Sequence, residues 1–233
     1  MAADCGVVIV AGGAGNRMGG GRPKQLRPLL GLPLFLWSAK ALGPCPEVRE
    51  IVVVGPAEHL DEMRDACRAH NIARLGALVP GGTLRQESVR AGVAALSEEC
   101  VLAAVHDAAR PFPPPGFGEA VRRARACGAA ILASPVAETL KCVEGGRIAG
   151  TMARAAIWAA HTPQVVGRDL LLRALDHCAQ AGIEVTDEAA AVEAMGGIVE
   201  VVESSRTNLK ITTPDDWALA EAIAEAMLKA TCG

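Results

Sequence analysis

A glycine-rich loop directly after a short apolar run is the feature that most constrains how this sequence can fold. The run Val7–Ala11 is β-branched and about as long as a strand, which predicts a strand buried on both faces of a parallel sheet. Six glycines follow within ten residues: Gly12, Gly13, Gly15, Gly19, Gly20 and Gly21. Because glycine has no Cβ, backbone N–H groups in such a loop can approach a phosphate closely. Arg17 and Lys24 add positive charge, so the stretch predicts a phosphate-binding loop.

The two best-known phosphate-binding motifs do not fit this loop. The dinucleotide fingerprint needs Gly-x-Gly-x-x-Gly or a final Ala, and here Met18 stands at the last position. The P-loop needs a Gly-Lys pair, which the chain lacks. What remains is Gly-x-Gly-x-Arg followed by Pro23-Lys24, a pattern typical of sugar-nucleotide and related nucleotidyltransferases. The alternative is a plain glycine-rich surface loop, which is disfavoured because open α/β sheets bind ligands directly after a buried strand.

Apolar strand-length runs alternate with helical patterns along most of the chain. Further strands are predicted at Ile51–Val54, Ala77–Val79, Val101–Val105, Ala129–Ala133 and Ile198–Val202. Helices are predicted at Phe35–Leu42, Ala57–His70, Arg85–Leu96, Phe117–Cys127 and Asp169–Ala181, with a further helix capped by Thr186 and a last one starting at Thr213-Pro214. This alternation predicts a three-layer α/β fold with a mostly parallel, twisted sheet and right-handed connections. With no repeat or linker, residues 1–233 are expected to form one domain.

The segment Ser134–Ala160 interrupts the alternation. Two strand-like runs, Glu138–Val143 and Arg147–Met152, flank Glu144-Gly145-Gly146, which predicts a β-hairpin. A hairpin that projects from the domain buries little by itself, so a second subunit is the expected packing partner. The alternative is a hairpin folded back on its own domain.

Composition narrows the functional classes. The chain is 51% apolar and 21% charged with a net charge of −3, so no general nucleic-acid or membrane partner is expected. The eight cysteines include no C-x-x-C pair, which argues against a zinc or thioredoxin-like site and favours a reducing compartment. No apolar run approaches 18 residues and the N-terminus lacks a secretory or transit pattern. The protein is expected to be soluble and cytoplasmic.

Asp107 is the strongest single candidate for chemistry outside the loop. It follows the predicted strand Val101–Val105, where a carboxylate can hold Mg²⁺ on phosphates or accept a bond from a substrate hydroxyl. The alternative is a cap or turn residue. Arg110 is expected to be functional and His106 to pack or orient the loop, whereas Lys210 taken alone reads as an ordinary surface residue. The chain shows neither a Ser/His/Asp nor an HExxH arrangement.

Taken in order, these motifs resemble those of the 2-C-methyl-D-erythritol 4-phosphate cytidylyltransferases, the CTP-using enzymes of the non-mevalonate isoprenoid pathway. The matching motifs are A-G-G-x-G-x-R-M around Arg17, P-K-Q at 23–25, G-G-x-x-R-x-x-S-V at 81–89, V-H-D-A-A-R-P at 105–111, P-V-x-x-T-x-K at 135–141, W-x-x-x-T-P-Q at 158–164, T-D-E-A at 186–189 and N-x-K-I-T-x-P-x-D at 208–216. The resemblance covers nearly the whole chain.

The resemblance implies a three-layer, Rossmann-like nucleotidyltransferase fold of the GT-A-like type. It also implies CMP transfer from CTP: the methylerythritol phosphate attacks the α-phosphorus in line and pyrophosphate leaves, with Mg²⁺ or another divalent cation as cofactor. The implied catalytic residues are Arg17 and Lys24, on the transition state and leaving pyrophosphate, and Arg154 and Lys210, on the attacking phosphate. Further implied ligands of that phosphate are Thr139, Arg110 and Thr162, with Asp107 contacting the metal or the substrate hydroxyls.

The resemblance also implies a cytidine cradle, a dimer and close rivals. The cradle comprises Ala11, Gly12, Gly13, Gly82 and Ser88, with Gly15, Thr83 and Ala108 as further substrate-binding residues. Thr83 departs from the family, which often has Asp there. Similar enzymes form homodimers by exchanging the 134–160 arm, which would place Thr139 and Arg154 in the partner's active site. The open alternatives are a cytidylyltransferase for another polyol phosphate, such as ribitol 5-phosphate, and a silent nucleotide-binding regulator. Because the chain ends at Gly233, no fused downstream synthase domain is expected.

Overall fold

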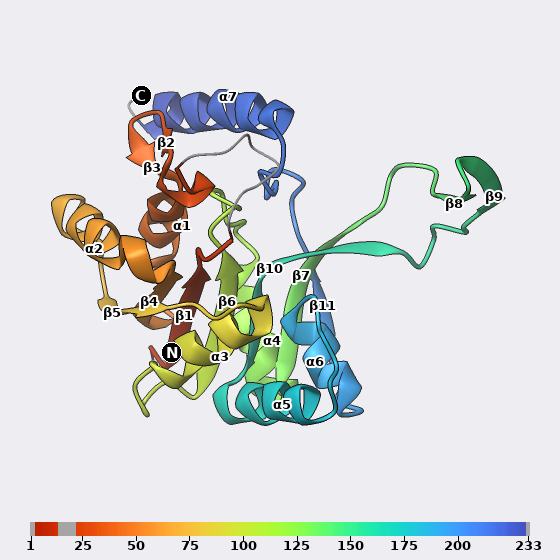
Figure 1. The fold of residues 1–233 in the computed structure, drawn as a ribbon, viewed down its shortest axis with the longest axis horizontal. Helices are drawn as coiled ribbons and strands as arrows, with labels where there is room; N and C mark the ends of the chain where they lie inside the picture. The colour runs from red at the N-terminus through yellow and green to blue at the C-terminus, as the bar shows by residue number, and fades with distance from the viewer. Residues whose placement is uncertain (1–2, 14–21, 232–233) are drawn as a thin grey trace.

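Alternating side chains of the first strand, β1 (Cys5–Val10), enter two separate hydrophobic cores. Val7 and Ile9 belong to one core and Val8 to the other, and all three are fully buried. The strand is therefore the middle layer of a three-layer fold, as its apolar sequence predicts. The structure, a computed structural model, describes residues 3–13 and 22–231 (Figure 1).

The described residues form a seven-stranded sheet in the order β11-β7-β10-β6-β1-β4-β5. Besides β1, its strands are β4 (Val48–Gly55), β5 (Leu75–Pro80), β6 (Leu102–Asp107), β7 (Ala129–Pro135), β10 (Trp158–Gly167) and β11 (Glu200–Glu203). Only β10 pairs antiparallel, with β6 on one side and β7 on the other. The predicted α/β class with a mostly parallel sheet is confirmed.

Helices cover both faces of the sheet. One face carries α1 (Leu34–Leu42), α2 (Leu60–Ala69) and α4 (Phe117–Cys127), and the other carries α3 (Arg85–Ala94), α5 (Arg168–Gln180) and α6 (Glu188–Ala194). The last helix, α7 (Pro214–Thr231), lies across one end of the domain beside the small ribbon β2 (Pro28–Leu29) and β3 (Leu32–Pro33) (Figure 1). The predicted bounds of the helices agree with the observed bounds to within three residues.

Four local expectations are corrected by the structure. The strand β10 had no counterpart among the predicted strands, because Pro163 and a run of small residues hide its pattern. Val101 and Ile198 are exposed and precede their strands. The cap of α6 is Asp187, whose carboxylate accepts the backbone N–H of Ala190, not Thr186. The sequence also favours a short extended run that ends at Lys210-Ile211, but neither residue lies in a strand.

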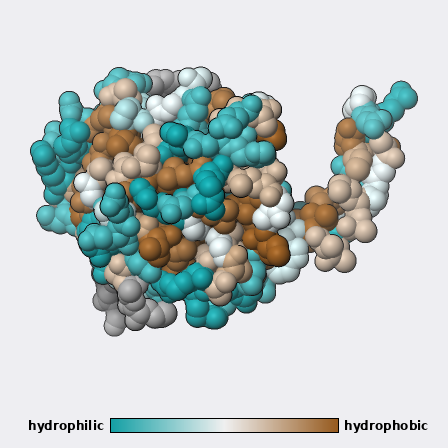
Figure 2. Space-filling view, turned by 90° about the horizontal axis from the view of Figure 1, so that it is seen from below, coloured by the Kyte–Doolittle hydropathy of each residue, from teal (hydrophilic) through white to brown (hydrophobic). Residues whose placement is uncertain are grey.

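The predicted hairpin is present and projects from the domain. Its strands are β8 (Lys141–Glu144) and β9 (Arg147–Thr151), joined by Gly145 and Gly146 at φ +56° and +77°, which suit a two-residue hairpin turn. The ends of the predicted 134–160 arm belong to β7 and β10 and pair within the sheet. The remainder stands clear of the body with apolar side chains on its surface (Figure 2).

None of the helices in the described ranges is both long enough and apolar enough to cross a bilayer.

Candidate active site

The carboxyl ends of β1 and β6 bring the glycine-rich loop and Asp107 side by side. Val10 is the register partner of Asp107, and the Ala108 N–H donates to the Val10 carbonyl at 3.0 Å. On the other side, the Ala11 N–H donates to the Val54 carbonyl at 2.7 Å. The loop therefore leaves the sheet at its centre, where open α/β folds bind their ligands.

Residues of the predicted cytidine cradle meet at one place. The Ser88 hydroxyl accepts the Gly82 N–H at 3.1 Å and donates to the Leu84 carbonyl at 3.3 Å. A Cβ on Gly12 would lie 3.7 Å from the Ser88 oxygen, and one on Gly81 only 2.8 Å from it. The chain thus needs glycine at 81 for this close approach.

Four further residues of the predicted substrate-binding set fall within the described part of the chain near the ends of β1, β5 and β6: Ala11, Gly13, Thr83 and Ala108. Gly13 and Thr83 are exposed, whereas Ala11 and Ala108 are buried. Gly15 and Arg17 fall outside the described residues. The positions of Gly13 and Thr83 leave their backbone and side-chain groups open to a ligand.

Two of the predicted cations converge from distant parts of the sequence. Lys24 begins a 3₁₀ turn (Lys24–Leu26), its side chain is buried, and its ammonium donates to the Ile211 carbonyl. Ile211 follows Lys210, whose ammonium lies 2.7 Å from Oδ2 of Asp107. The Lys24 ammonium therefore contacts the backbone next to Lys210, and Lys210 in turn contacts Asp107, although 186 residues separate the two lysines in the sequence.

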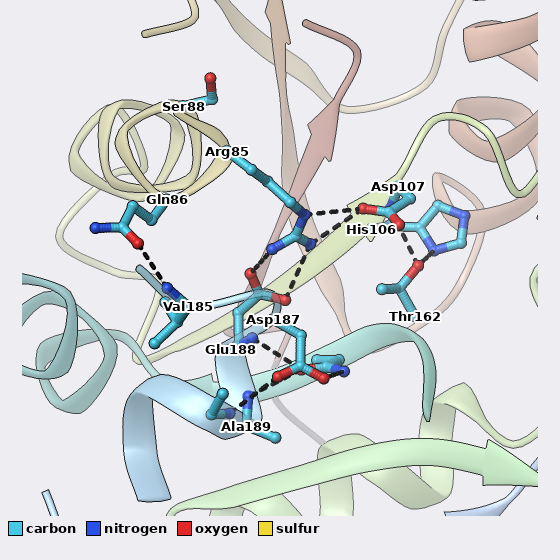
Figure 3. A network of polar contacts seen from close by, with 12 residues as sticks. Arg85, Gln86, Ser88, His106, Asp107, Thr162, Val185, Asp187, Glu188 and Ala189 are labelled. Atoms are coloured by element: carbon cyan, nitrogen blue, oxygen red, sulfur yellow. Dashed lines mark hydrogen bonds and ion pairs between the residues drawn. The ribbon is translucent and has the colours of Figure 1, made fainter. Parts of the chain in front are cut away.

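Asp107 lies between two cations, Arg85 and Lys210, and Figure 3 shows the Arg85 side of this arrangement. Its Oδ1 accepts bonds from Arg85 Nη2 at 3.0 Å and Nε at 3.3 Å, while Oδ2 faces Lys210. Burial disfavours the carboxylate form, but the charges of Arg85 and Lys210 outweigh burial and hold the pKa of Asp107 well below its ordinary value. Asp107 is therefore an anionic, hard oxygen donor at any physiological pH.

His106 and Thr162 hold the backbone at Asp107. Nε2 of His106 lies 2.8 Å from the Arg110 carbonyl, which can only accept, so the imidazole carries its proton on Nε2. Nδ1 then accepts the Thr162 hydroxyl at 3.1 Å, and the same hydroxyl accepts the Asp107 N–H at 3.0 Å. Burial lowers the pKa of His106 to about 4, so it is neutral. In this arrangement the Thr162 hydroxyl donates its proton to His106, so it has no proton left to donate to a phosphate.

A cavity of about 270 Å³ opens beside this group. Its lining includes Arg110, Arg206 and Lys210, together with Ser134 and His161. Arg110 is buried, and its Nε has no hydrogen-bond partner among the described residues. Burial of the guanidinium also lowers the pKa of Arg110. The carboxylate of Glu138 also lines the cavity, but three cations outnumber it, and the excess positive charge favours an anionic occupant such as a phosphate.

Two of the predicted catalytic and binding residues lie away from this group. Thr139 and Arg154 are exposed on the projecting arm, and the Arg154 guanidinium donates to the Ala137 carbonyl within the arm itself.

Sequence reasoning missed Arg85 and Glu188 as site residues. Arg85 starts α3 and Glu188 starts α6, and they form a partly buried ion pair at 2.7 Å. Both occur in motifs that carry the family resemblance, G-G-x-x-R-x-x-S-V and T-D-E-A, and that placement is the signal that could have identified them.

Comparison with known proteins identifies the family. The family model described as 2-C-methyl-D-erythritol 4-phosphate cytidylyltransferase matches residues 5–226. The chain belongs to the 2-C-methyl-D-erythritol 4-phosphate cytidylyltransferase family. A relative with that name from Bacillus licheniformis is 40% identical over 222 residues, 94% of this chain and 95% of the relative. Another from Salinibacter ruber is 38% identical over 218 residues, covering 93% of this chain and 91% of the relative.

Solved cytidylyltransferases of this family have the same fold. The Thermus thermophilus enzyme superposes with a TM-score of 0.77 at 32% identity and covers 94% of this chain and 98% of its own. The family resemblance inferred from the motifs is thus confirmed, and the chain is an enzyme of the nucleotidyltransferase class.

Proposed function

We propose that this chain transfers the CMP group of CTP to 2-C-methyl-D-erythritol 4-phosphate, giving 4-diphosphocytidyl-2-C-methyl-D-erythritol and pyrophosphate. Family membership supports both substrates. The observation that carries the proposal is the group formed by Lys24, Asp107 and Lys210 at the carboxyl ends of β1 and β6, next to a cavity lined by Arg110. Such a group can neutralise two phosphate-bearing substrates at once.

The chemistry requires positioned charge more than proton transfer. A phosphate oxygen of the acceptor forms a bond to the α-phosphorus, and the bond from that phosphorus to the pyrophosphate oxygen breaks. A phosphate monoester is largely dianionic at neutral pH, since its second pKa is about 6, so its oxygen needs no general base. His106 fits this mechanism as a neutral group that orients the loop. We assign Lys24 and Arg17 to the transition state and leaving group, and Lys210, Arg110 and Arg154 to the acceptor phosphate.

Asp107 is the residue we propose as the protein ligand of a divalent cation. Mg²⁺ prefers oxygen donors and commonly takes one or two carboxylates together with substrate phosphates. The low pKa of Asp107 and its position beside the glycine-rich loop fit that donor set. When bound, the cation would neutralise phosphate charge. In the present arrangement Oδ1 accepts two N–H groups of Arg85 and Oδ2 faces Lys210, so a bound cation would use the remaining lone pairs of these oxygens.

The projecting arm supports a homodimer. Val143, Ile148, Met152 and Trp158 are large apolar side chains that are 42–67% exposed on or at the base of the arm. Apolar surface of this kind favours burial against another protein surface. We propose that two copies exchange arms, which would bring Thr139 and Arg154 to the partner's cavity. The described cysteines are all free thiols, which fits the cytoplasm as the proposed location.

Pyrophosphate release from CTP tests the substrate. We expect turnover with 2-C-methyl-D-erythritol 4-phosphate and, at equal concentration, far less with ribitol 5-phosphate. Preference for ribitol 5-phosphate would replace the proposed acceptor, and CTP binding without turnover on either would indicate a silent regulator.

Variants at the two loop cations test the mechanism. Lys24→Ala and Arg17→Ala are each expected to lower kcat by roughly two to three orders of magnitude in a folded protein. Near-normal kcat in either variant would remove that residue from the proposed mechanism.

A further inference from the structure

Four side chains of alternating charge form a continuous row that leads away from the proposed reaction centre. Lys210 contacts Oδ2 of Asp107 at 2.7 Å, and Arg85 contacts Oδ1 at 3.0 Å. Arg85 then reaches Glu188, with Nη1 2.7 Å from Oε1 and Nη2 3.3 Å from Oε2 (Figure 3). The order is positive, negative, positive, negative. Only Lys210 is substantially exposed, with 44% of its side chain accessible.

Glu188 is the buried end of this row. Its side chain is 1% exposed, and both of its oxygens accept N–H groups of Arg85, the pattern of an ionised carboxylate. Burial raises the pKa of Glu188, while the Arg85 charge works against that rise. Burial would also lower the pKa of Arg85, but the carboxylates of Glu188 and Asp107 outweigh it and raise that pKa. The guanidinium therefore stays charged.

The backbone around Glu188 is fixed from the sheet. Gln164 of β10 accepts the N–H groups of Glu188 and Ala189 through Oε1, both at 3.0 Å. Its Nε2 donates to Asp187, the cap of α6, at 3.0 Å. The start of α6 is thus locked to the sheet, and the Glu188 carboxylate is held where it meets Arg85.

The geometry divides the guanidinium of Arg85 between two carboxylates. Glu188 takes Nη1 and part of Nη2, so Arg85 engages only one oxygen of Asp107 and leaves Oδ2 to Lys210. Arginine and a single carboxylate favour a two-pronged pairing that uses both carboxylate oxygens. Without the Glu188 charge, Arg85 is free to take both oxygens of Asp107. Arg85 would then compete with Lys210 for Oδ2 of Asp107.

We propose that Glu188 is a positioning residue for the transfer reaction. It holds Arg85 so that one oxygen of Asp107 stays free to hold Lys210 over the acceptor phosphate. The inference rests on the proposed function, because it assigns Lys210 to that phosphate. A buried ion pair with a purely structural role would affect folding stability, not the use of one substrate.

The test is Glu188→Gln, which keeps the shape and removes the charge. We expect kcat/KM for the acceptor phosphate to fall roughly 10- to 100-fold, the usual range for a residue that orients a ligand-contacting group, with the KM for CTP unchanged. Glu193→Gln is the matched control, since Glu193 is exposed on the same helix. Wild-type turnover of CTP with the acceptor is measured first, and its absence would refute the proposed function rather than this inference.

A double-variant comparison distinguishes a role of Glu188 in positioning Lys210 from a general effect on the folded protein. In a Lys210→Met background, Glu188→Gln should have almost no further effect on kcat/KM, because the group it positions is gone. An equal fold-loss in both backgrounds, or wild-type kinetics in the single variant, would overturn the proposal. If Glu188→Gln does not fold, Glu188→Asp keeps the charge on a shorter side chain. It should give a smaller loss that likewise disappears in the Lys210→Met background, and persistence of that loss would overturn the proposal.

Discussion

Replacing Lys210 by Met should separate activity from stability more clearly than any other substitution in the site. The Lys210 side chain is 44% exposed, and its only ion pair in the described part of the chain is with Asp107 at 2.7 Å. A partly exposed pair contributes about 0.2–1 kcal/mol to stability. Asp107 would keep Arg85 as a partner, so no unpaired buried charge results. For a chain of this size, that loss corresponds to a fall in Tm of about 2–4 °C at most.

The effect on the reaction should be far larger. A positive group aimed at charge that develops on the transferred phosphates contributes about 3–4 kcal/mol to transition-state stabilisation. That energy corresponds to a fall in kcat/KM of roughly 100- to 1,000-fold. Lys210→Met should therefore be nearly as stable as wild type and almost inactive.

The assay is pyrophosphate release at saturating CTP and varied acceptor phosphate, together with thermal unfolding of the same samples. Lys229→Met is the control, because Lys229 is 80% exposed on α7 and lies 3.7 Å from Glu225. A kcat/KM within about threefold of wild type would refute the reasoning, because 3–4 kcal/mol predicts a far larger loss. A large fall in Tm would show instead that Lys210 acts on folding.

Three further predictions concern the arm, the sheet packing and pH. Subunits carrying Arg154→Ala and Lys24→Ala, each inactive alone, should regain about a quarter of wild-type activity when mixed as random dimers, because half of the dimers then hold one intact shared site. Gly92→Ala should lower the free energy of unfolding by about 1–3 kcal/mol in urea titrations, because the new Cβ would lie 2.3 Å from Cγ1 of Val8. Burial of His161, with the nearby Arg110 charge, lowers its pKa to about 4. Between pH 6.5 and 4 this imidazole is therefore protonated in the unfolded chain but neutral in the folded chain. Stability should therefore fall as pH drops through that window, and His161→Gln should reduce the slope in urea titrations by up to about 1.4 kcal/mol per pH unit, while His106, whose pKa burial also lowers to about 4, keeps its own contribution.

Each of these three has a result that would contradict it. Mixed subunits with no activity would argue against a shared site. Gly150→Ala is the control for Gly92→Ala, since nothing lies within 4 Å of its new Cβ, and equal losses in both variants would remove the packing argument. An unchanged pH slope in His161→Gln would assign the acid sensitivity to other groups.

Local patterns predicted most of the fold. The β-branched run in β1, the amphipathic segments that became α2 and α4, and the two glycines of the hairpin turn each depend on neighbouring residues only. The strand β10 could not be read in this way. Its antiparallel place between β6 and β7 depends on which strands flank it, and its own sequence contains a proline.

Some residues of the candidate site could likewise be identified from the sequence, and others could not. The glycine-rich loop and Asp107 were identifiable from the sequence, because each directly follows an apolar strand and the ends of parallel strands meet at one edge of a sheet. Lys210 and Arg154 gained their roles only from the family resemblance. Arg85 and Glu188, 103 residues apart, were not identified at all.

The sequence by itself therefore determined the family and most of the elements, and it predicted a phosphate-binding loop. Only the tertiary structure decided which charges meet, because a pairing across 103 residues depends on the order of strands in the sheet and on the locking of α6 to β10. The spacing of apolar residues depends only on neighbours along the chain, and it predicts helices and strands. The electrostatic field at Asp107 is set by Arg85 and Lys210, which are close to it in space but distant in the sequence.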